Sequence, residues 1–380
     1  MYSEMKNLFK QKKQLYFDYA ASTPIAPEVM KAMMPYFDRW YNNPSNKTNL
    51  TSIQIDTDIA EATENILSLF GGGNQNIIYT SGATESINTC LKSLYHLAGA
   101  NKKQIITART EHQATISVCE YLSSLGANII YLKVNRDGQI DLNELSEIIM
   151  PETLVVTLMG VNNETGVVYD TKAISRICKE HNVPFVCDTT QMVGKIPMKP
   201  FEADYIIGSA HKIYGAKGVG FIITHEQAEI QPLIHGGGQQ NKLRSGTLNV
   251  PGIIALVKAL ELSLSQIHEN YNYVSKLQKH FETELLATGN VEVIGKQTQR
   301  SPYITNIRLL NGRCSEMIGE LADVIAFSTS SACSSAKVSH VLTDMGLSNE
   351  EASQCCRFSF SAYQSQKEID KAIKYIKNYL

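Results

Sequence analysis

Seven short runs rich in apolar and β-branched residues recur between residues 77 and 224, and they constrain the fold more than any other feature. Stretches with helical spacing separate them, such as Glu85–Leu97, where Ile87, Leu91 and Leu94 share one face. Runs that are continuously apolar are typical of a mainly parallel sheet with helices on both faces, so we predict an α/β architecture. The predicted strands are Ile77–Thr80, Gln104–Ala108, Asn128–Val134, Leu154–Val161, Val183–Asp188, Tyr205–Ser209 and Val219–Thr224.

A different pattern follows residue 249. Asn249 can cap a helix that has Pro251 at its first position, and the strand-like run Ile304–Leu310 lies between further helices. Because 380 residues are too many for one small core, we expect two domains: a large one over 16–256, and a smaller α+β domain formed by 1–15 and 257–380. The last two helices are expected to begin with the capping boxes Ser348/Glu351 and Ser365/Glu368.

Charge and hydropathy exclude several classes of protein. A formal net charge of −2 argues against nonspecific nucleic-acid binding, which needs a basic surface. The apolar runs fall short of the roughly 20 residues of a membrane span, and the lysine-rich N-terminus has no apolar core of a secretory signal. The eight cysteines form no CxxC pair. We therefore expect a cytoplasmic protein with no membrane and no direct nucleic-acid partner.

One predicted strand is followed at once by Ser209-Ala-His211-Lys212. A lysine that leaves a buried strand can sit in a desolvated cleft, where its pKa falls and it can form a Schiff base. For Lys212 alone, an ordinary surface lysine is the alternative.

Three other strand ends could hold a phosphorylated pyridine cofactor. The turn Ser81-Gly82-Ala83-Thr84 opens a helix, where backbone N–H groups and the Thr84 hydroxyl would bind phosphate. Asp188 could keep a pyridine nitrogen protonated or simply cap the next segment. His112 lies at the edge of the sheet where ligands bind in open α/β folds, although a lone histidine is often structural.

Seven blocks in a fixed order resemble the cysteine desulfurases, which have the aspartate-aminotransferase-type fold of pyridoxal-phosphate enzymes. The match runs from Tyr16 to Phe360. The resemblance implies that pyridoxal 5′-phosphate is the cofactor and that L-cysteine is converted to L-alanine. The blocks are TSGATESIN, TEHQATI, VNNETGVV, DTTQMVGK, GSAHKIYGAKG, HGGGQQNKLRSGTLN and SACSS.

The resemblance also assigns roles by position. Lys212 would carry the cofactor as a Schiff base and then take the Cα proton, while Asp188 would pair with the pyridine nitrogen. His112 would stack on the ring and move protons, and it is our candidate for deprotonating the substrate thiol. Arg357 would bind the substrate carboxylate with its bidentate fork, close to Asn163. Thr247 would reach the phosphate of the partner subunit, which implies a homodimer. Further cofactor contacts would come from Ala83, Thr84, Asn163, Gln191, Ser209 and His211.

Cys333, in SACSS, matches the family's sulfur acceptor and would hold the sulfur as a persulfide. The surrounding residues are small and polar, which predicts a loop and an exposed, mobile thiol. Cys355 and Cys356 fit core packing better. The sulfur would pass to an acceptor protein, such as an iron–sulfur scaffold or a tRNA- or DNA-thiolation enzyme, and the sequence leaves this choice open.

Some positions depart from the family pattern. Ser330 replaces a usual glycine, Phe360-Ser361 replaces Gly-Arg, and Asn49 stands where histidine is frequent. The segment from Cys333 to Val341 is short, and the chain stops at Leu380, so we expect it to lack the extended tail that housekeeping members use to dock a scaffold. These differences concern sulfur delivery rather than the cofactor site.

Two other enzyme classes stay open, a selenocysteine lyase and a class-V aminotransferase, and Cys333 argues against the second. A non-catalytic sulfur-handling partner with the same fold is the remaining alternative. Against that alternative stands the joint presence of Lys212, Asp188, His112, Cys333 and Arg357. Release of alanine from L-cysteine would separate an active enzyme from a non-catalytic partner.

Overall fold

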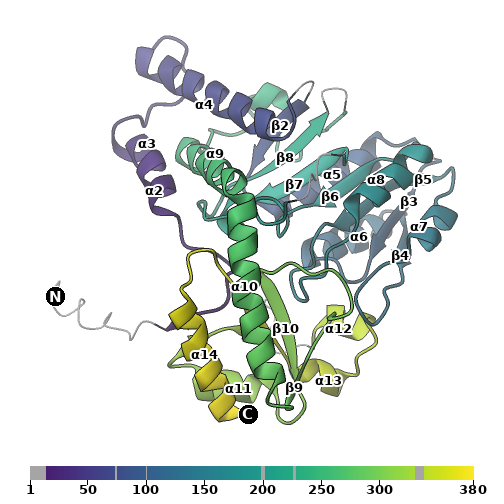
Figure 1. The fold of residues 1–380 in the computed structure, drawn as a ribbon. Helices are drawn as coiled ribbons and strands as arrows, with labels where there is room; N and C mark the ends of the chain where they lie inside the picture. Colours follow the sequence, from purple (N-terminus) through teal and green to yellow (C-terminus); the bar gives the residue numbers. More distant parts are fainter. Residues whose placement is uncertain (1–13, 73–74, 100, 198–201, 226–227, 330–337) are drawn as a thin grey trace.

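The computed structural model describes residues 14–72, 75–99, 101–197, 202–225, 228–329 and 338–380. Helices and strands alternate along its first part, and the strands form a seven-stranded sheet (Figure 1). Each strand end lies within two residues of its predicted position, and the predicted α/β class is confirmed. The strands are β2 (Gln75–Thr80), β3 (Gln104–Ala108), β4 (Asn128–Leu132), β5 (Thr153–Met159), β6 (Phe185–Asp188), β7 (Tyr205–Ser209) and β8 (Gly220–His225).

The direction of these strands decides where a site can form. The order in the sheet is β2-β8-β7-β6-β5-β3-β4. The pairs β3–β4, β3–β5, β5–β6 and β6–β7 are parallel, whereas β8 pairs antiparallel with both of its neighbours. β8 therefore runs against the other six strands, whose carboxyl ends meet at one edge of the sheet, the edge that binds ligands in open α/β folds.

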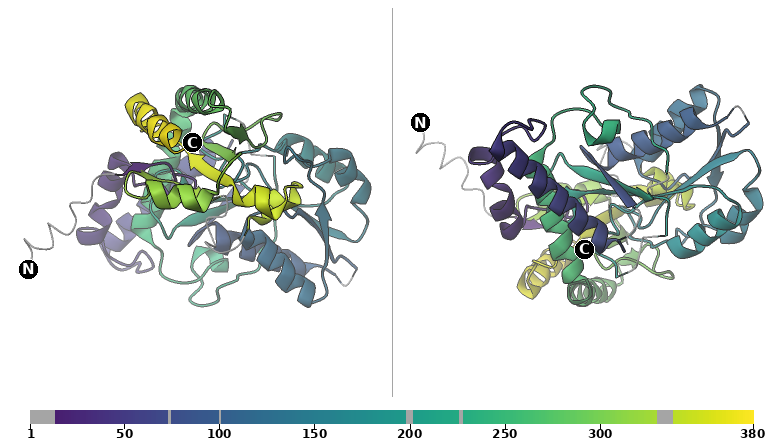
Figure 2. Two further views of the ribbon diagram at one scale, coloured as in Figure 1. Left: turned by 90° about the horizontal axis from the view of Figure 1, so that it is seen from below. Right: turned by 90° about the horizontal axis from the view of Figure 1, so that it is seen from above.

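Both faces of the large sheet are covered by helices (Figures 1 and 2). Neighbouring residues of one strand enter opposite layers: Ile105 packs with α5 and α6, whereas Ile106 packs with α4, α8 and α9. This alternation explains why the strands are continuously apolar. The helices of this part are α2 (Pro27–Met33), α3 (Pro35–Asp38), α4 (Leu50–Leu69), α5 (Ala83–Leu97), α6 (Gln113–Ser124), α7 (Leu142–Ile148), α8 (Thr171–Glu180) and α9 (Val250–Ser265), with short 3-10 turns η1 (Ala210–Lys212) and η2 (Gln240–Lys242).

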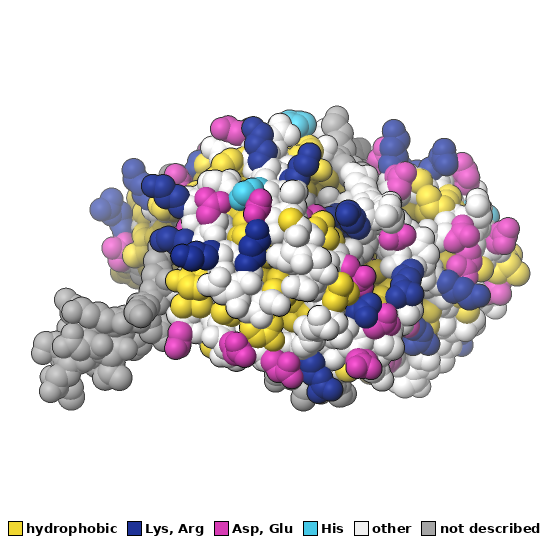
Figure 3. Space-filling model, turned by 60° about the horizontal axis from the view of Figure 1, so that its bottom comes forward, with side chains coloured by type: hydrophobic (Ala, Val, Ile, Leu, Met, Phe, Trp, Pro, Cys, Tyr) yellow, Lys and Arg dark blue, Asp and Glu magenta, His cyan; other side chains and the backbone are white. Residues whose placement is uncertain are grey.

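A second, antiparallel sheet lies at the lower end of the molecule in Figure 1, with the order β12-β13-β10-β9. Its core is aromatic: the rings of Phe17 and Phe281 lie 5.9 Å apart, and those of Phe327 and Phe358 lie 4.6 Å apart. Around it, basic and acidic side chains are mixed on the face seen in Figure 3. The elements are β1 (Leu15–Tyr16), α10 (Ile267–Leu286), β9 (Val291–Val293), β10 (Ile304–Leu309), α11 (Cys314–Leu321), β11 (Ile325–Ala326), β12 (Ser328–Thr329), α12 (His340–Asp344), α13 (Asn349–Ser353), β13 (Cys355–Ser359) and α14 (Gln366–Tyr379).

The helix caps follow the sequence closely. Both predicted capping boxes are present, at the starts of α13 and α14. Asn249 caps α9 by accepting a hydrogen bond from the Gly252 N–H. The first helical residue is Val250, however, so the prediction that Pro251 stands first was wrong by one position. Proline is tolerated there because the first turn of a helix needs no intrahelical N–H donor.

The buried side chains form separate apolar clusters. Leu260 of α9 belongs to the cluster of the large sheet, whereas Phe17 and Ala20, near the N-terminus, belong to that of the small sheet. The division into domains at residues 256 and 257 stays a prediction. Among the described residues, no single helix is long and apolar enough to cross a membrane; α9 and α10 would qualify only together, across a bend of 73°.

Candidate active site

A pocket of about 1030 Å³ lies at the carboxyl edge of the large sheet. The strand ends of β2, β3, β5, β6 and β7 lead into it, and Arg357 reaches it from the small sheet. Thr247 does not line this pocket and is exposed, and Cys333 lies outside the described residues. The predicted site residues that line it are Ala83, Thr84, His112, Asn163, Asp188, Gln191, Ser209, His211, Lys212 and Arg357.

Lys212 ends the short turn η1 that follows β7. Its Nζ donates hydrogen bonds to the carbonyl oxygens of Ala20 (2.7 Å) and Ala21 (2.8 Å). A second lysine, Lys195, lies nearby and is 4% exposed, and its Nζ donates to Gln191 Oε1 at 2.8 Å. Burial, reinforced by the charge of Lys212, lowers the pKa of Lys195 to about 7. Sequence reasoning missed Lys195, although it stands four residues after Gln191 in a matching block.

The turn between β2 and α5 is built to bring backbone N–H groups to the pocket. Gly82 has a φ of 155° and caps α5 without a side-chain hydrogen bond. A Cβ at Gly220 of the neighbouring strand would lie 2.6 Å from Gly82 Cα, so only glycine permits this close packing. The start of α5 thus presents amide donors and a positive helix end beside Ser209, Ala83 and Thr84, a combination that binds phosphate.

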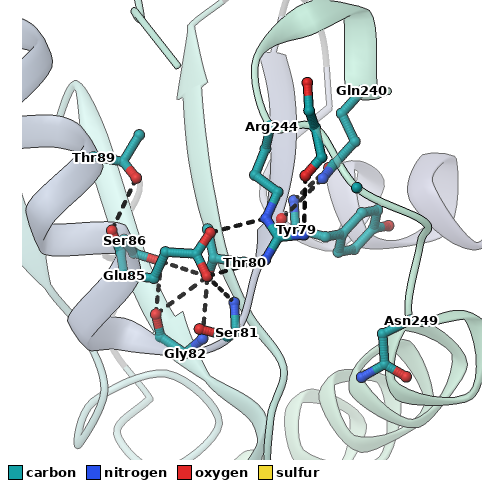
Figure 4. A network of polar contacts seen from close by, with 12 residues as sticks. Tyr79, Thr80, Ser81, Gly82, Glu85, Ser86, Thr89, Gln240, Arg244 and Asn249 are labelled. Carbon is teal, nitrogen blue, oxygen red and sulfur yellow. Dashed lines mark hydrogen bonds and ion pairs between the residues drawn. The ribbon is translucent and has the colours of Figure 1, made fainter. Parts of the chain in front are cut away.

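An ion pair fixes this turn to a distant segment (Figure 4). Glu85 accepts from the Ser81 N–H at 2.8 Å, and Arg244 Nε donates to Glu85 Oε1 at 2.9 Å. Gln240 adds bonds to both backbone groups of Tyr79. The Arg244 and Glu85 side chains are 23% and 9% exposed, so solvent screens the pair only partly. The segment before Thr247 is therefore held against the turn between β2 and α5, a contact that the sequence alone did not reveal.

Asp188 ends β6 and is largely buried. One carboxylate oxygen, Oδ1, accepts from the Thr190 N–H at 2.9 Å, so Asp188 also has the capping role that the sequence left open. The Thr190 hydroxyl is buried and lacks a hydrogen-bond partner among the described residues, although Thr190 lines the pocket. Burial, together with the charge of Asp188, also holds the pKa of Glu111 well above its usual range.

His112 caps α6 rather than pointing freely into solvent. Its Nδ1 accepts a hydrogen bond from the Ala114 N–H at 3.1 Å. Burial lowers the pKa of His112 despite the nearby carboxylate of Asp188, and the positive charges of Lys212 and Arg357 lower it further.

Arg357 lies in the middle of β13 and is 1% exposed. Its Nη2 donates to Asp18 Oδ1 at 2.8 Å, and its Nη1 donates to the Asn163 carbonyl at 3.0 Å. Its Nε is buried without a hydrogen-bond partner in the described part of the chain. Asp18 was missed as a site residue, although its motif YFDYAASTP begins the region that resembles the family.

The neighbouring cysteines belong to the core. Cys355 is 1% exposed and Cys356 is fully buried, and burial raises the pKa of both thiols. A buried thiol with a raised pKa is a poor nucleophile. This agrees with the prediction that these two residues pack in the core.

These residues fit pyridoxal phosphate by the chemistry of their donors. A lysine amine, a strand-terminal carboxylate and a helix start free of side-chain caps match the aldehyde, pyridine nitrogen and phosphate of that cofactor. The unpaired Thr190 hydroxyl is a further polar group facing this region. Nothing among the described lining residues conflicts with the fit.

Comparison with known proteins gives one consistent result. The family model for class-V aminotransferases matches residues 15–372. The cysteine desulfurase IscS of Buchnera aphidicola subsp. Acyrthosiphon pisum (strain 5A) is 36% identical over 373 residues, which span 96% of this chain and 92% of the relative.

Two solved structures agree with this result. A NifS-like protein superimposes with a TM-score of 0.89 at 32% identity, covering 97% of this chain and 100% of its own. SspA, solved in complex with cysteine, gives a TM-score of 0.79 at 30% identity over 92% and 99% of the two chains. The chain therefore belongs to the class-V aminotransferases and, among them, to the cysteine desulfurases, enzymes that depend on pyridoxal phosphate.

Proposed function

We propose that this chain converts L-cysteine to L-alanine and holds the released sulfur as a persulfide on Cys333. One observation carries the proposal: Lys212, Asp188, His112 and Arg357, which lie on four separate segments, line a single pocket. The related SspA structure contains cysteine, which supports the choice of substrate. Production of alanine from L-cysteine by the purified protein tests the proposal, and its absence from the cofactor-loaded protein would contradict it.

In this mechanism, pyridoxal phosphate supplies an electron sink for the charge that develops at the substrate Cα. Lys212 Nζ would hold the cofactor covalently and, as a free amine, would take the Cα proton. The Asp188 carboxylate would keep the pyridine nitrogen protonated. The amide groups at the start of α5 would bind the phosphate. We assign the remaining cofactor contacts to Ala83, Thr84, Asn163, Gln191, Ser209 and His211, and place His112 against the ring.

His211 supports this assignment through its charge state. Burial and the neighbouring Lys212 lower its pKa to about 4, so the imidazole is neutral at pH 7. A neutral imidazole can donate one hydrogen bond to a phosphate without an opposing buried charge of its own.

Arg357 is proposed to bind the substrate carboxylate. Two of its nitrogens already hold Asp18 and the Asn163 carbonyl, which fixes the orientation of the guanidinium. Since a guanidinium has five N–H donors, donors remain for a carboxylate.

Replacing Arg357 with alanine should raise the KM for L-cysteine about 10- to 100-fold, because a charge-assisted hydrogen bond contributes about 1.5–3 kcal/mol. The visible spectrum of the bound cofactor should not change. The matched control is Arg308→Ala. Arg308 lies on the neighbouring strand and forms ion pairs with Glu292 and Glu351 outside the pocket. Initial rates of alanine formation check the result, and an unchanged KM in Arg357→Ala would place the carboxylate elsewhere.

The homodimer and the sulfur-acceptor protein are part of the proposal. Thr247 is exposed and lies outside the pocket of its own chain, where a second copy can contact it. The Arg244–Glu85 ion pair fixes the segment that leads to it. We propose that Thr247 contacts the phosphate of the partner subunit. The sulfur acceptor would be an iron–sulfur scaffold or a tRNA- or DNA-thiolation enzyme.

Thr247→Ala should therefore weaken cofactor binding. The pocket of each subunit keeps its own residues and loses only the contact from the partner subunit. We expect the rate of cofactor loss on dilution to rise about tenfold, since one hydrogen bond to a charged group is removed. Sedimentation velocity and absorbance during dilution test this together. A wild-type chain that stays monomeric with full activity would contradict the dimer.

A further inference from the structure

Two histidines line the pocket next to each other, His112 and His340. They are linked through the backbone of Glu111: His112 follows it in the chain, and His340 Nε2 lies 3.0 Å from the Glu111 carbonyl oxygen. The expected proton acceptor was His112, and His340 had no assigned role. Their hydrogen bonds decide which ring nitrogen carries the proton in each.

His112 has its proton on Nε2. Nδ1 accepts from the Ala114 N–H, so it must present a lone pair there. A second proton could enter only at Nδ1, where it would displace the cap of α6. Burial, which lowers the pKa of His112, acts in the same direction. His112 is thus a neutral hydrogen-bond donor through Nε2 and a poor acceptor of protons.

In His340 the nitrogen left free is Nδ1, whereas in His112 it is Nε2. The Glu111 carbonyl can only accept, so His340 Nε2 carries the proton and Nδ1 keeps the lone pair. No hydrogen bond to Nδ1 is found among the described residues. Because the imidazole lines the pocket and stands at the start of α12, Nδ1 is available as a base.

Two carboxyl groups, those of Glu164 and Asp344, interact electrostatically with His340. Ser339, the cap of α12, donates to Glu164 Oε2, which holds that carboxyl group beside His340. Burial raises the pKa of Glu164 to about 7, although the hydrogen bond from Ser339 and the charges of His340 and Arg357 act to lower it. Burial raises the pKa of Asp344, on α12 itself, while charges on Arg109 and His340 act to lower it. The opposing positive charge is that of Arg357, whereas His112 is neutral.

We propose that His340, and not His112, is the base that takes the proton of the substrate thiol. The S–H bond breaks, the proton passes to Nδ1 of His340, and the electron pair stays on sulfur. His112 remains neutral and donates a hydrogen bond from Nε2. This assignment rests on the proposed function, because it needs L-cysteine in the pocket.

The kinetic test compares a substrate that has a thiol with one that has none. His340→Gln keeps an N–H donor for the Glu111 carbonyl but removes the titratable nitrogen. We measure alanine release from L-cysteine and exchange of the Cα hydrogen of L-alanine in D₂O. The ratio of the first rate to the second should fall about 100-fold in His340→Gln, the usual scale for loss of a general base. His268→Gln, at an exposed position of α10, is the control and should leave the ratio unchanged.

A second readout does not depend on activity. In the ¹⁵N-histidine-labelled holoenzyme, the ring nitrogen resonances are assigned by comparison with His112→Asn and His340→Gln. We expect a bare Nδ1 and a protonated Nε2 for both rings in the neutral state. A protonated Nδ1 on neutral His340, or a wild-type ratio in folded His340→Gln, would overturn the proposal while alanine production still stood. If wild type released no alanine, the proposed function itself would fail.

Discussion

Lys212→Ala should abolish alanine formation and remove the covalent link to pyridoxal phosphate. The amine is required both as the attachment point and as the acceptor of the Cα proton, and proton transfer alone accounts for about 10²–10⁴ in rate. Cofactor should remain only noncovalently bound, through the start of α5 and Asp188, so gel filtration should strip it faster than from wild type. Absorbance spectra and turnover measure both effects.

Lys212→Arg is the matched control for this variant. It keeps a positive charge and N–H donors for the Ala20 and Ala21 carbonyls, yet it cannot form the covalent link. It should therefore fold normally and remain inactive. Borohydride reduction of the wild-type protein followed by peptide mapping should label Lys212. A label on Lys195, whose pKa is lowered to about 7, would show that the wrong lysine had been chosen.

Cys333→Ser should still bind L-cysteine and change the cofactor spectrum, because Lys212, Asp188 and Arg357 are untouched. It should release alanine only at a trace rate, since a serine hydroxyl is a poor nucleophile toward sulfur. The expected loss is at least about 10²-fold, the lower end of what a single catalytic group contributes. Stopped-flow spectra and alanine assays separate the binding step from the transfer step.

The buried cysteines provide the control for Cys333→Ser. Cys355→Ala and Cys356→Ala remove thiols whose raised pKa and burial make them poor nucleophiles, so both should keep most of the activity. Any loss should follow the melting temperature, because these side chains pack in the core beside α13 and β10. A stable Cys356→Ala variant without activity would show that the thiol of Cys356, on β13, takes part in the reaction.

The sequence predicted the large sheet well because its strands are buried on both faces, which leaves an unbroken apolar signal. The parallel strand ends then brought the predicted cofactor residues to one edge, and the helix caps were predicted from local chemistry alone. Strand ends shifted where an isolated bridge replaced a regular ladder, as at Val134 and Val161.

The contacts that complete the site could not be predicted in this way. Asp18 and Arg357 are 339 residues apart in the chain, and Arg244 is 159 residues from Glu85. Periodicity and capping rules act over a few residues, so they contain no information on such pairs. The tautomer of His112 likewise depends on a backbone N–H that is donated only once α6 has formed.

The central claim is that sulfur leaves L-cysteine on the thiol of Cys333. Brief exposure of the holoenzyme to L-cysteine, alkylation of all thiols and peptide mass spectrometry would locate the added sulfur atom. We predict that the peptide containing Cys333 gains the mass of one sulfur and that the peptide containing Cys355 and Cys356 does not. Sulfur found chiefly on the second peptide, with Cys333 unmodified, would contradict this account of transfer.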